Sequence, residues 1–365
     1  MKVSLALALL GASVFAADEL AATPLITSAT TKFGSAIEGV GVDKAGVVYA
    51  TDFGDKLTQA GQVTGSQNLL YQASNTTAYV NGIRFNIDSS GAEEAYIADA
   101  ALHRVYRLTG RQGADGAFSN NEVFCEDEGI LQPNDLAIAP SAGRIFLSGM
   151  NYTSDSVVGN GDLWTCDSSG AARRLGQFHR TNGIEVSPDE KTLYLSESQN
   201  TGGAVVANRV LAFDLDAATG DVTNKRVFVD FGTLDDTAAT DIDGMRAAAN
   251  GNLYVTRNGI GKVAVFSPAG ELVSYITTPS IDFVASLDFG GESGSDLHMV
   301  GKCKDDETKG CVDVYNGLTL GRSSRDLRKS SGGSDGGSED GSDGGSEGGS
   351  TAPPAGCGKA GRARK

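Results

Sequence analysis

Six residues with oxygen-bearing side chains recur along the chain, each at the start of a similar segment. Examples of these segments are "EGVGVDKAGVVYATD", "NGIEVSPDEKTLYLSE" and "DGMRAAANGNLYVTR". In chain order the first residues are Glu38, Asn81, Asn134, Asn182, Asp243 and Ser286. Carboxylate, amide and hydroxyl oxygens are hard ligands, which suit calcium, magnesium or manganese far better than zinc or copper. If the six side chains converge, the sequence predicts a divalent-cation site.

The six segments must be placed around one centre for that site to form. Each segment reads as a short alternating strand, a turn rich in Gly, Pro, Asp, Asn and Ser, and a second strand. Their first residues lie 43, 53, 48, 61 and 43 residues apart, which is the spacing of propeller blades. Two further β-rich runs follow most segments, such as "RVLAFDL" and "KRVFVDF". Since the innermost strands line the channel, the six first residues are expected to ring its mouth.

The last repeat reaches the C-terminal tail before a fourth strand can form. The segment "TPLITSATTKF", ahead of the first repeat, is the obvious strand to complete the sixth sheet and leave no open edge. We therefore predict an all-β fold in which residues 23–322 form a six-bladed β-propeller of four-stranded blades. In this prediction the N-terminal strand closes the last blade.

The two ends of the chain read differently from the repeats. Residues 1–16 combine Lys2 with an apolar run too short to span a bilayer and small residues at positions 14 and 16, which predicts a secretory signal peptide. Residues 17–22 are a short lead, and the Ser/Gly/Asp-rich residues 323–365 are predicted to be disordered. We expect a secreted monomer without a membrane span. A net charge of −16 argues against nucleic acid or an anionic membrane as partner.

Five cysteines in an exported chain suggest two disulfides and one remaining thiol. Cys303 and Cys311 flank "KDDETKG", a loop between two predicted strands, and are the favoured pair. Cys125 with Cys166 is the weaker candidate pair, because four structured cysteines permit three pairings. The fifth, Cys357, lies in the tail.

Asn-x-Thr sequons at Asn75 and Asn151 predict N-glycosylation in surface loops.

A simpler explanation exists for any single repeat. Asn-Gly and Asp-Gly are common in tight turns, where they tolerate left-handed backbone. This alternative explains the residue type at one copy, but it does not explain why the whole set carries only oxygen donors.

The repeats resemble the gluconolactonase family that includes senescence marker protein, a group of six-bladed propellers. The motifs "QPNDLAIAPSAGRIF", "TNGIEVSPDEKTLYLSE" and "IDGMRAAANGNLYV" carry the resemblance over nearly the whole structured chain. It implies that Glu38, Asn182 and Asp243 hold a divalent cation in the channel. Calcium is the cation most often found there, with magnesium, manganese or zinc as alternatives. It also implies that Asn134 contacts either the cation or the substrate.

The substrate contacts are less conventional. Members that act on sugar lactones tend to have an Arg two residues before the Asn of the third motif, and this chain has Gln132 there. Gln132, Asn134, the adjacent Asp135 and His179, three residues before Asn182, are the expected substrate-binding residues.

Two functions remain open on this reading. The first is a metal-dependent hydrolase that opens a lactone or cleaves an ester, with Asp243 as the general base or as the group that orients the nucleophile. The second is a non-catalytic, calcium-binding propeller that serves as a binding module. A serine hydrolase is disfavoured, because the chain has no G-x-S-x-G motif and only three histidines. His103 and His298 are expected in strands, and Trp164 in the core of the third blade.

Overall fold

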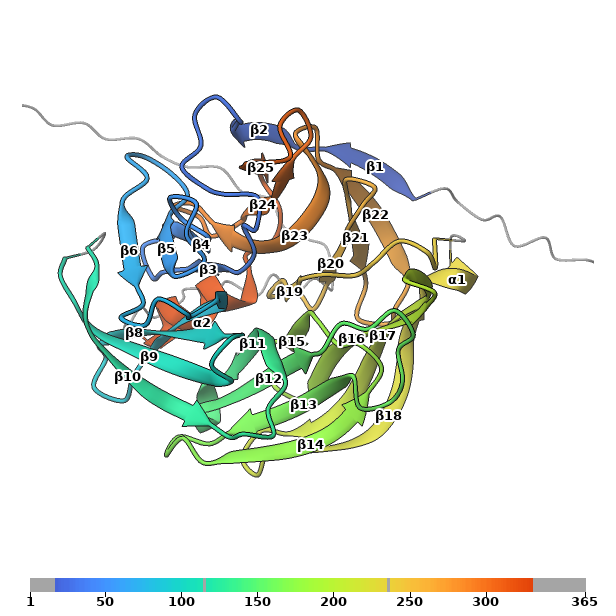
Figure 1. The fold of residues 1–365 in the computed structure, drawn as a ribbon, viewed down its shortest axis with the longest axis horizontal. Coiled ribbons are helices and arrows are strands. Elements are labelled where there is room, and N and C mark those ends of the chain that lie inside the picture. The colour runs from blue at the N-terminus through green and yellow to red at the C-terminus, as the bar shows by residue number, and fades with distance from the viewer. Residues whose placement is uncertain (1–16, 114–115, 235–236, 331–365) are drawn as a thin grey trace, which may run out of the picture. The chain divides into compact units, whose positions relative to one another are not determined.

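The computed structural model describes residues 17–330 except 114–115 and 235–236, and the predicted signal peptide and residues 331–365 lie outside this range. Six sheets surround a central channel, as Figure 1 shows. The predicted six-bladed β-propeller with four-stranded blades is therefore confirmed.

Each blade is a meander whose first strand is innermost. The strands of blades 1 to 3 are β3 (Val40–Val42), β4 (Val48–Thr51), β5 (Gln59–Gln62), β6 (Leu69–Gln72), β7 (Val80–Ile87), β8 (Glu93–Asp99), β9 (Arg104–Arg111), β10 (Phe118–Glu126), β11 (Gln132–Ala139), β12 (Arg144–Met150), β13 (Gly161–Cys166) and β14 (Ala172–Phe178). Those of blades 4 to 6 are β15 (Ile184–Val186), β16 (Thr192–Thr201), β17 (Ala204–Asp216), β18 (Asp221–Asp230), β19 (Met245–Ala247), β20 (Leu253–Arg257), β21 (Lys262–Phe266), β22 (Leu272–Thr277), β23 (Ile281–Gly290), β24 (Asp296–Cys303) and β25 (Gly310–Tyr315). Two short helices, η1 (Pro140–Ala142) and α1 (Phe231–Leu234), lie in connections.

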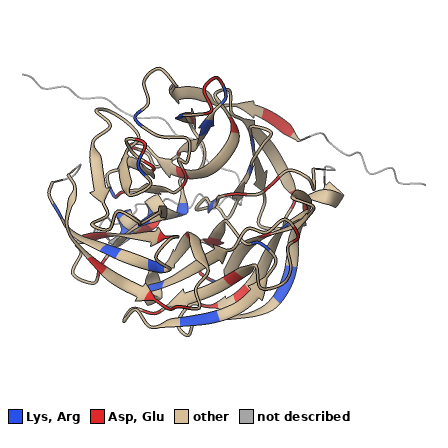
Figure 2. Ribbon diagram, in the orientation of Figure 1, with Lys and Arg blue, Asp and Glu red and all other residues tan. Residues whose placement is uncertain are grey.

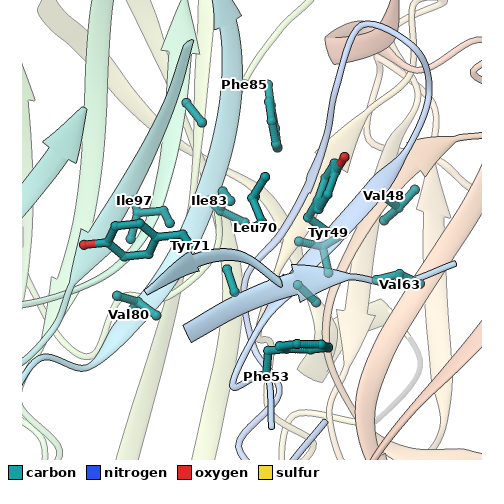
Figure 3. Close-up of a cluster of buried hydrophobic side chains, with 14 of the residues drawn as sticks. Val48, Tyr49, Phe53, Val63, Leu70, Tyr71, Val80, Ile83, Phe85 and Ile97 are labelled. Carbon is teal, nitrogen blue, oxygen red and sulfur yellow. The ribbon is translucent and has the colours of Figure 1, made fainter. Parts of the chain in front are cut away.

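The large side chains of the second strands pack between neighbouring blades. The Tyr49 ring of blade 1 lies 5.3 Å from that of Phe85 in blade 2, and Tyr254 of blade 5 lies 5.0 Å from Phe289 in blade 6. Figure 3 shows the cluster around Tyr49 and Phe85. Burying each such ring contributes about 1.5–3 kcal/mol, which holds the blades against one another. The residues at this position of the repeat are all buried: Tyr49, Tyr96, Phe146, Tyr194, Tyr254 and His298.

The N-terminal segment closes the ring in two places. β2 (Thr23–Ile26) pairs antiparallel with β25 and forms the fourth strand of blade 6, as predicted. β1 (Asp18–Ala21) pairs parallel with β22 as a fifth strand of blade 5. The lead of residues 17–22 is thus part of the propeller.

Helix α2 (Arg322–Ser330) lies at the end of the channel opposite the predicted cation site. Its side chains bond to the far ends of three innermost strands and their turns. Arg322 donates to the carbonyl oxygen of Ile138 at 3.2 Å, and Ser324 Oγ donates to that of Phe289 at 2.8 Å. Figure 1 shows α2 within the ring of blades. The tail was predicted to begin at residue 323, but residues 323–330 belong to this docked helix.

Two disulfides are present among the described residues. Cys303–Cys311 joins β24 to β25, and Cys125–Cys166 joins blade 2 to blade 3. The favoured pair and the weaker candidate pair are both confirmed.

In the described part of the chain, no helix combines the length and apolar character needed to cross a membrane.

Candidate metal centre

All six first residues of the repeats line one small cavity at the channel mouth. They come from the innermost strands or from the residue or two just before them, one from each blade. The structure therefore brings together side chains that are far apart in the sequence. The six are Glu38, Asn81, Asn134, Asn182, Asp243 and Ser286.

Glycine follows four of these six residues and allows the innermost strands to approach closely. A Cβ on Gly183 would lie 2.4 Å from the carbonyl oxygen of Asp243, and the Gly183 N–H donates to that oxygen at 2.8 Å. Neither Asn182 nor Gly183 has a positive φ. The left-handed-turn explanation is therefore wrong at this repeat. Gly183 is needed instead for the backbone contact between blades 4 and 5.

Two carboxylates in the cavity lack a cationic partner. Burial, with Asp135 and Asp52 nearby, raises the pKa of Glu38 to about 7. Burial also raises the pKa of Asp243 well above its usual range, and the charges of Glu38 and Asp241 add to that effect. Across the described ranges, no Lys or Arg forms an ion pair with either group. Such a pair of converging carboxylates favours a bound cation or proton.

Asn182 adds an oxygen that has no hydrogen-bond donor. Its side-chain oxygen Oδ1 is buried and unpartnered, while its backbone N–H donates to Ser196 Oγ at 3.0 Å. A buried acceptor without a donor costs about 1–3 kcal/mol, which a cation ligand bond would offset. The residues present therefore fit a hard divalent cation, which Glu38, Asn182 and Asp243 would hold.

The channel below the cavity is filled by ion pairs. Asp135 contacts Arg84 at 2.5 Å and Arg246 at 3.3 Å. Burial and Arg246 lower the pKa of Arg84 to about 10, so its guanidinium stays protonated at neutral pH. Figure 2 shows both signs of charge on strands around the channel.

This network continues to the far end of the channel. Arg246 Nε lies 3.5 Å from Asp288, and Arg322 of α2 lies 2.6 Å from Glu185. Arg322 also contacts Asp326 of α2 at 3.2 Å, and Asp326 pairs with Arg325. Four guanidinium groups thus face four carboxylates, so their charges balance. The two carboxylates at the mouth are left as excess negative charge.

Sequence reasoning missed the residues of this network other than Asp135. A signal was present, because Arg84, Glu185 and Arg246 each lie three residues after a first residue of a repeat. A charged residue at a repeated position of a buried strand indicates a partner inside the channel.

The predicted substrate contacts occupy different places. Asn134 and Asp135 line the cavity, but both carboxylate oxygens of Asp135 are engaged by arginines. Gln132 is exposed at the start of β11. His179 does not line the cavity. Its Nδ1 lies 3.1 Å from the carbonyl oxygen of Ser156 in the β12–β13 loop.

The remaining predicted residues fall outside the cavity. His103 was expected in a strand, but it occupies the β8–β9 turn with a φ of 56°. His298 is buried in β24, where burial lowers its pKa, and Trp164 is in the core as predicted. Asn75 and Asn151 are exposed in loops.

Comparison with protein families gives one match that spans half of the chain. The model of the SMP-30/Gluconolactonase/LRE-like region matches residues 119–301.

Solved structures with the same fold cover most of the chain. Regucalcin from Agrobacterium tumefaciens, described as a calcium-binding protein, is 18% identical with a TM-score of 0.61, covering 84% of this chain and 96% of that one. A gluconolactonase from Xanthomonas campestris is 19% identical with a TM-score of 0.54, covering 83% and 99%. At this level of identity the likeness shows the fold alone.

A curated relative matches a shorter segment. The peptidylglycine alpha-amidating monooxygenase of Rattus norvegicus is 29% identical over 132 residues, which is 32% of this chain. The match spans 12% of that protein's length.

Proposed function

The chain belongs to the SMP-30/gluconolactonase/LRE-like family, and from this premise we propose that it is a cation-dependent hydrolase that opens a lactone or cleaves an ester. One observation carries the proposal. The buried carboxylates of Glu38 and Asp243, which form no ion pair with a described basic residue, share the cavity with the unpartnered side-chain oxygen of Asn182. Calcium is the preferred cation, because the donor set consists of oxygens only.

Three residues of the cavity have further roles in this proposal. When bound, the cation supplies Lewis-acid polarisation of the substrate carbonyl. Asp243 takes up the proton of the attacking water, which its position in the cavity allows. The acyl carbon–oxygen bond then breaks, and the same proton passes to the alkoxide oxygen that leaves. Asn134 donates its side-chain amide to the substrate and orients it. Asp135 pairs with Arg84 and Arg246 below the cavity and takes no part in catalysis.

The charges near the mouth favour a neutral substrate. Gln132 has no charge with which to bind a carboxylate, and Arg180, which lies two residues before Asn182, is paired with Asp241 at 2.7 Å. We therefore propose neutral lactones and aryl esters as the substrate class.

Export is part of the same proposal. The two disulfides support an oxidising compartment, in agreement with the signal peptide predicted for residues 1–16.

The test uses purified full-length protein and a panel of neutral lactones and aryl esters, with added calcium or with a chelator. Glu38→Gln and Asp243→Ala are expected to abolish turnover, while Glu122→Gln, on the exposed strand β10, is the matched control. No turnover with any substrate or metal would favour the non-catalytic binding module. Activity that survives in both cavity variants would place catalysis elsewhere.

A further inference from the structure

An ion pair joins the two loops that lead to candidate cation ligands. Arg180 lies two residues before Asn182 in the β14–β15 connection, and Asp241 lies two residues before Asp243 in the β18–β19 connection. The guanidinium nitrogen of Arg180 contacts Asp241 Oδ2 at 2.7 Å. The pair therefore connects blades 4 and 5 immediately ahead of both ligands.

Both partners of this pair are held in place. The Arg180 side chain is 6% exposed, and its Nε donates to Asn200 Oδ1 at 2.9 Å. Asp241 Oδ1 accepts from Ser198 Oγ at 2.8 Å and from the backbone N–H of Ile242 at 3.0 Å. Each carboxylate oxygen of Asp241 thus has a partner, so the pair has one defined geometry.

A second link lies just beyond the ligands. The backbone N–H of Gly183 donates to the carbonyl oxygen of Asp243 at 2.8 Å. Asn182 and Asp243 are therefore bracketed by a side-chain ion pair on one side and a backbone hydrogen bond on the other. This arrangement restricts how far the two ligand residues can separate.

We propose that Arg180 and Asp241 form a clamp that sets the spacing of Asn182 and Asp243, which makes Arg180 a positioning residue for the cation. The inference rests on the cation site of the proposed function. The expected effect is opposite in sign to simple electrostatics. Removing the positive charge of Arg180 would remove a Coulomb repulsion and so tighten cation binding. Loss of the clamp loosens the ligands and weakens binding.

The test is Arg180→Met in the full-length protein, with calcium titrated by calorimetry after chelator treatment and thermal unfolding recorded in the chelator. Calcium affinity is expected to fall about ten-fold, the scale seen when groups that orient metal ligands are removed. Arg209→Met is the matched control, because Arg209 pairs with Asp230 at 2.8 Å in the same blade, away from the cavity. Arg180→Lys, which keeps the charge, is expected to recover part of the affinity.

The outcomes separate the clamp from the cation site itself. Unchanged or tighter calcium binding in Arg180→Met would overturn the clamp, whatever happens to the melting temperature. If Arg180→Met does not fold, Arg180→Gln makes the same change of charge with a side chain that can still bond to Asn200. Glu38→Gln is measured in parallel. If Glu38→Gln binds calcium like the unaltered protein, the proposed cation site is wrong. If Glu38→Gln loses calcium binding while Arg180→Met does not, only the proposed clamp is wrong.

Discussion

The side-chain amide of Asn258 donates a hydrogen bond of 2.9 Å to Oδ2 of Asp243. The same nitrogen lies 3.3 Å from the carbonyl oxygen of Val284 in blade 6, and the backbone N–H of Asn258 donates to Asp241 at 2.9 Å. A neutral donor, itself held by the contacts to Val284 and Asp241, thus orients Asp243. Because the donor carries no charge, it leaves the carboxylate's charge for a cation.

Asn258→Leu should therefore weaken calcium binding. The variant keeps the approximate side-chain volume but removes the donor, so Asp243 loses its preferred orientation, at a cost of about ten-fold in affinity. Calorimetric titration measures the change. Asn250→Ala, in the β19–β20 turn at the opposite end of the propeller, is the control. Equal calcium affinity in the two variants would mean that Asn258 does not orient a ligand.

Cation binding should depend on pH in a direction set by the raised carboxylate pKa values. The pKa of Glu38 is raised from 4.5 to about 7, and that of Asp243 is also raised. Without metal, the folded protein therefore binds more protons than the unfolded chain at pH values between 4.5 and about 7. The contribution of the two groups to the free energy of unfolding therefore falls as the pH rises through that window. Calcium competes with those protons, so its affinity rises as the pH approaches and passes about 7.

Thermal unfolding with and without calcium measures this linkage. The calcium-induced rise in melting temperature should be large at about pH 8 and small at about pH 5.5. Glu38→Gln combined with Asp243→Asn removes both titrating groups and should abolish the difference. A calcium effect of the same size at both pH values would contradict the pKa assignment.

The blades were predictable from the sequence because each is a local meander repeated at a regular interval. β1 was missed, since "DELA" has no strand pattern of its own and becomes a strand only by pairing with β22. Helix α2 was missed for a similar reason. Its sequence is rich in Arg and Ser, and its place is set by tertiary contacts such as Arg322 with Glu185 and the buried Leu327.

The site was predictable as a ring, but the direction of individual side chains was not. Asn134 and Asp135 are adjacent, and both were expected to contact substrate. A register shift between Pro133 and Asp135 disturbs the alternation of the strand. Asp135 meets Arg84 and Arg246 within the channel, partners that no local pattern around Asp135 reveals.

Gly183→Ala should separate the innermost strands of blades 4 and 5. The new Cβ would lie 2.4 Å from a backbone oxygen, which cannot move without shifting the strand. We expect a loss of about 1–3 kcal/mol in the free energy of unfolding, typical of overpacking, together with weaker calcium binding. Denaturant unfolding measures the loss. Gly232→Ala is the control, because the nearest atoms to a Cβ at Gly232 would lie 3.3 Å away. If Gly183→Ala loses no more unfolding free energy than this control, the close approach of the two strands is not needed.

Gln132→Arg should shift substrate preference toward anions. Gln132 is exposed two residues before Asn134, so an arginine there would place a guanidinium beside the cavity mouth. We expect the KM for a lactone that carries a carboxylate to fall about ten-fold, because a charge-assisted hydrogen bond contributes about 1.5–3 kcal/mol. The KM for a neutral lactone should stay nearly unchanged. Gln177→Arg adds the same charge on the exposed outer strand β14, so an equal effect there would mean long-range attraction and no direct contact at position 132.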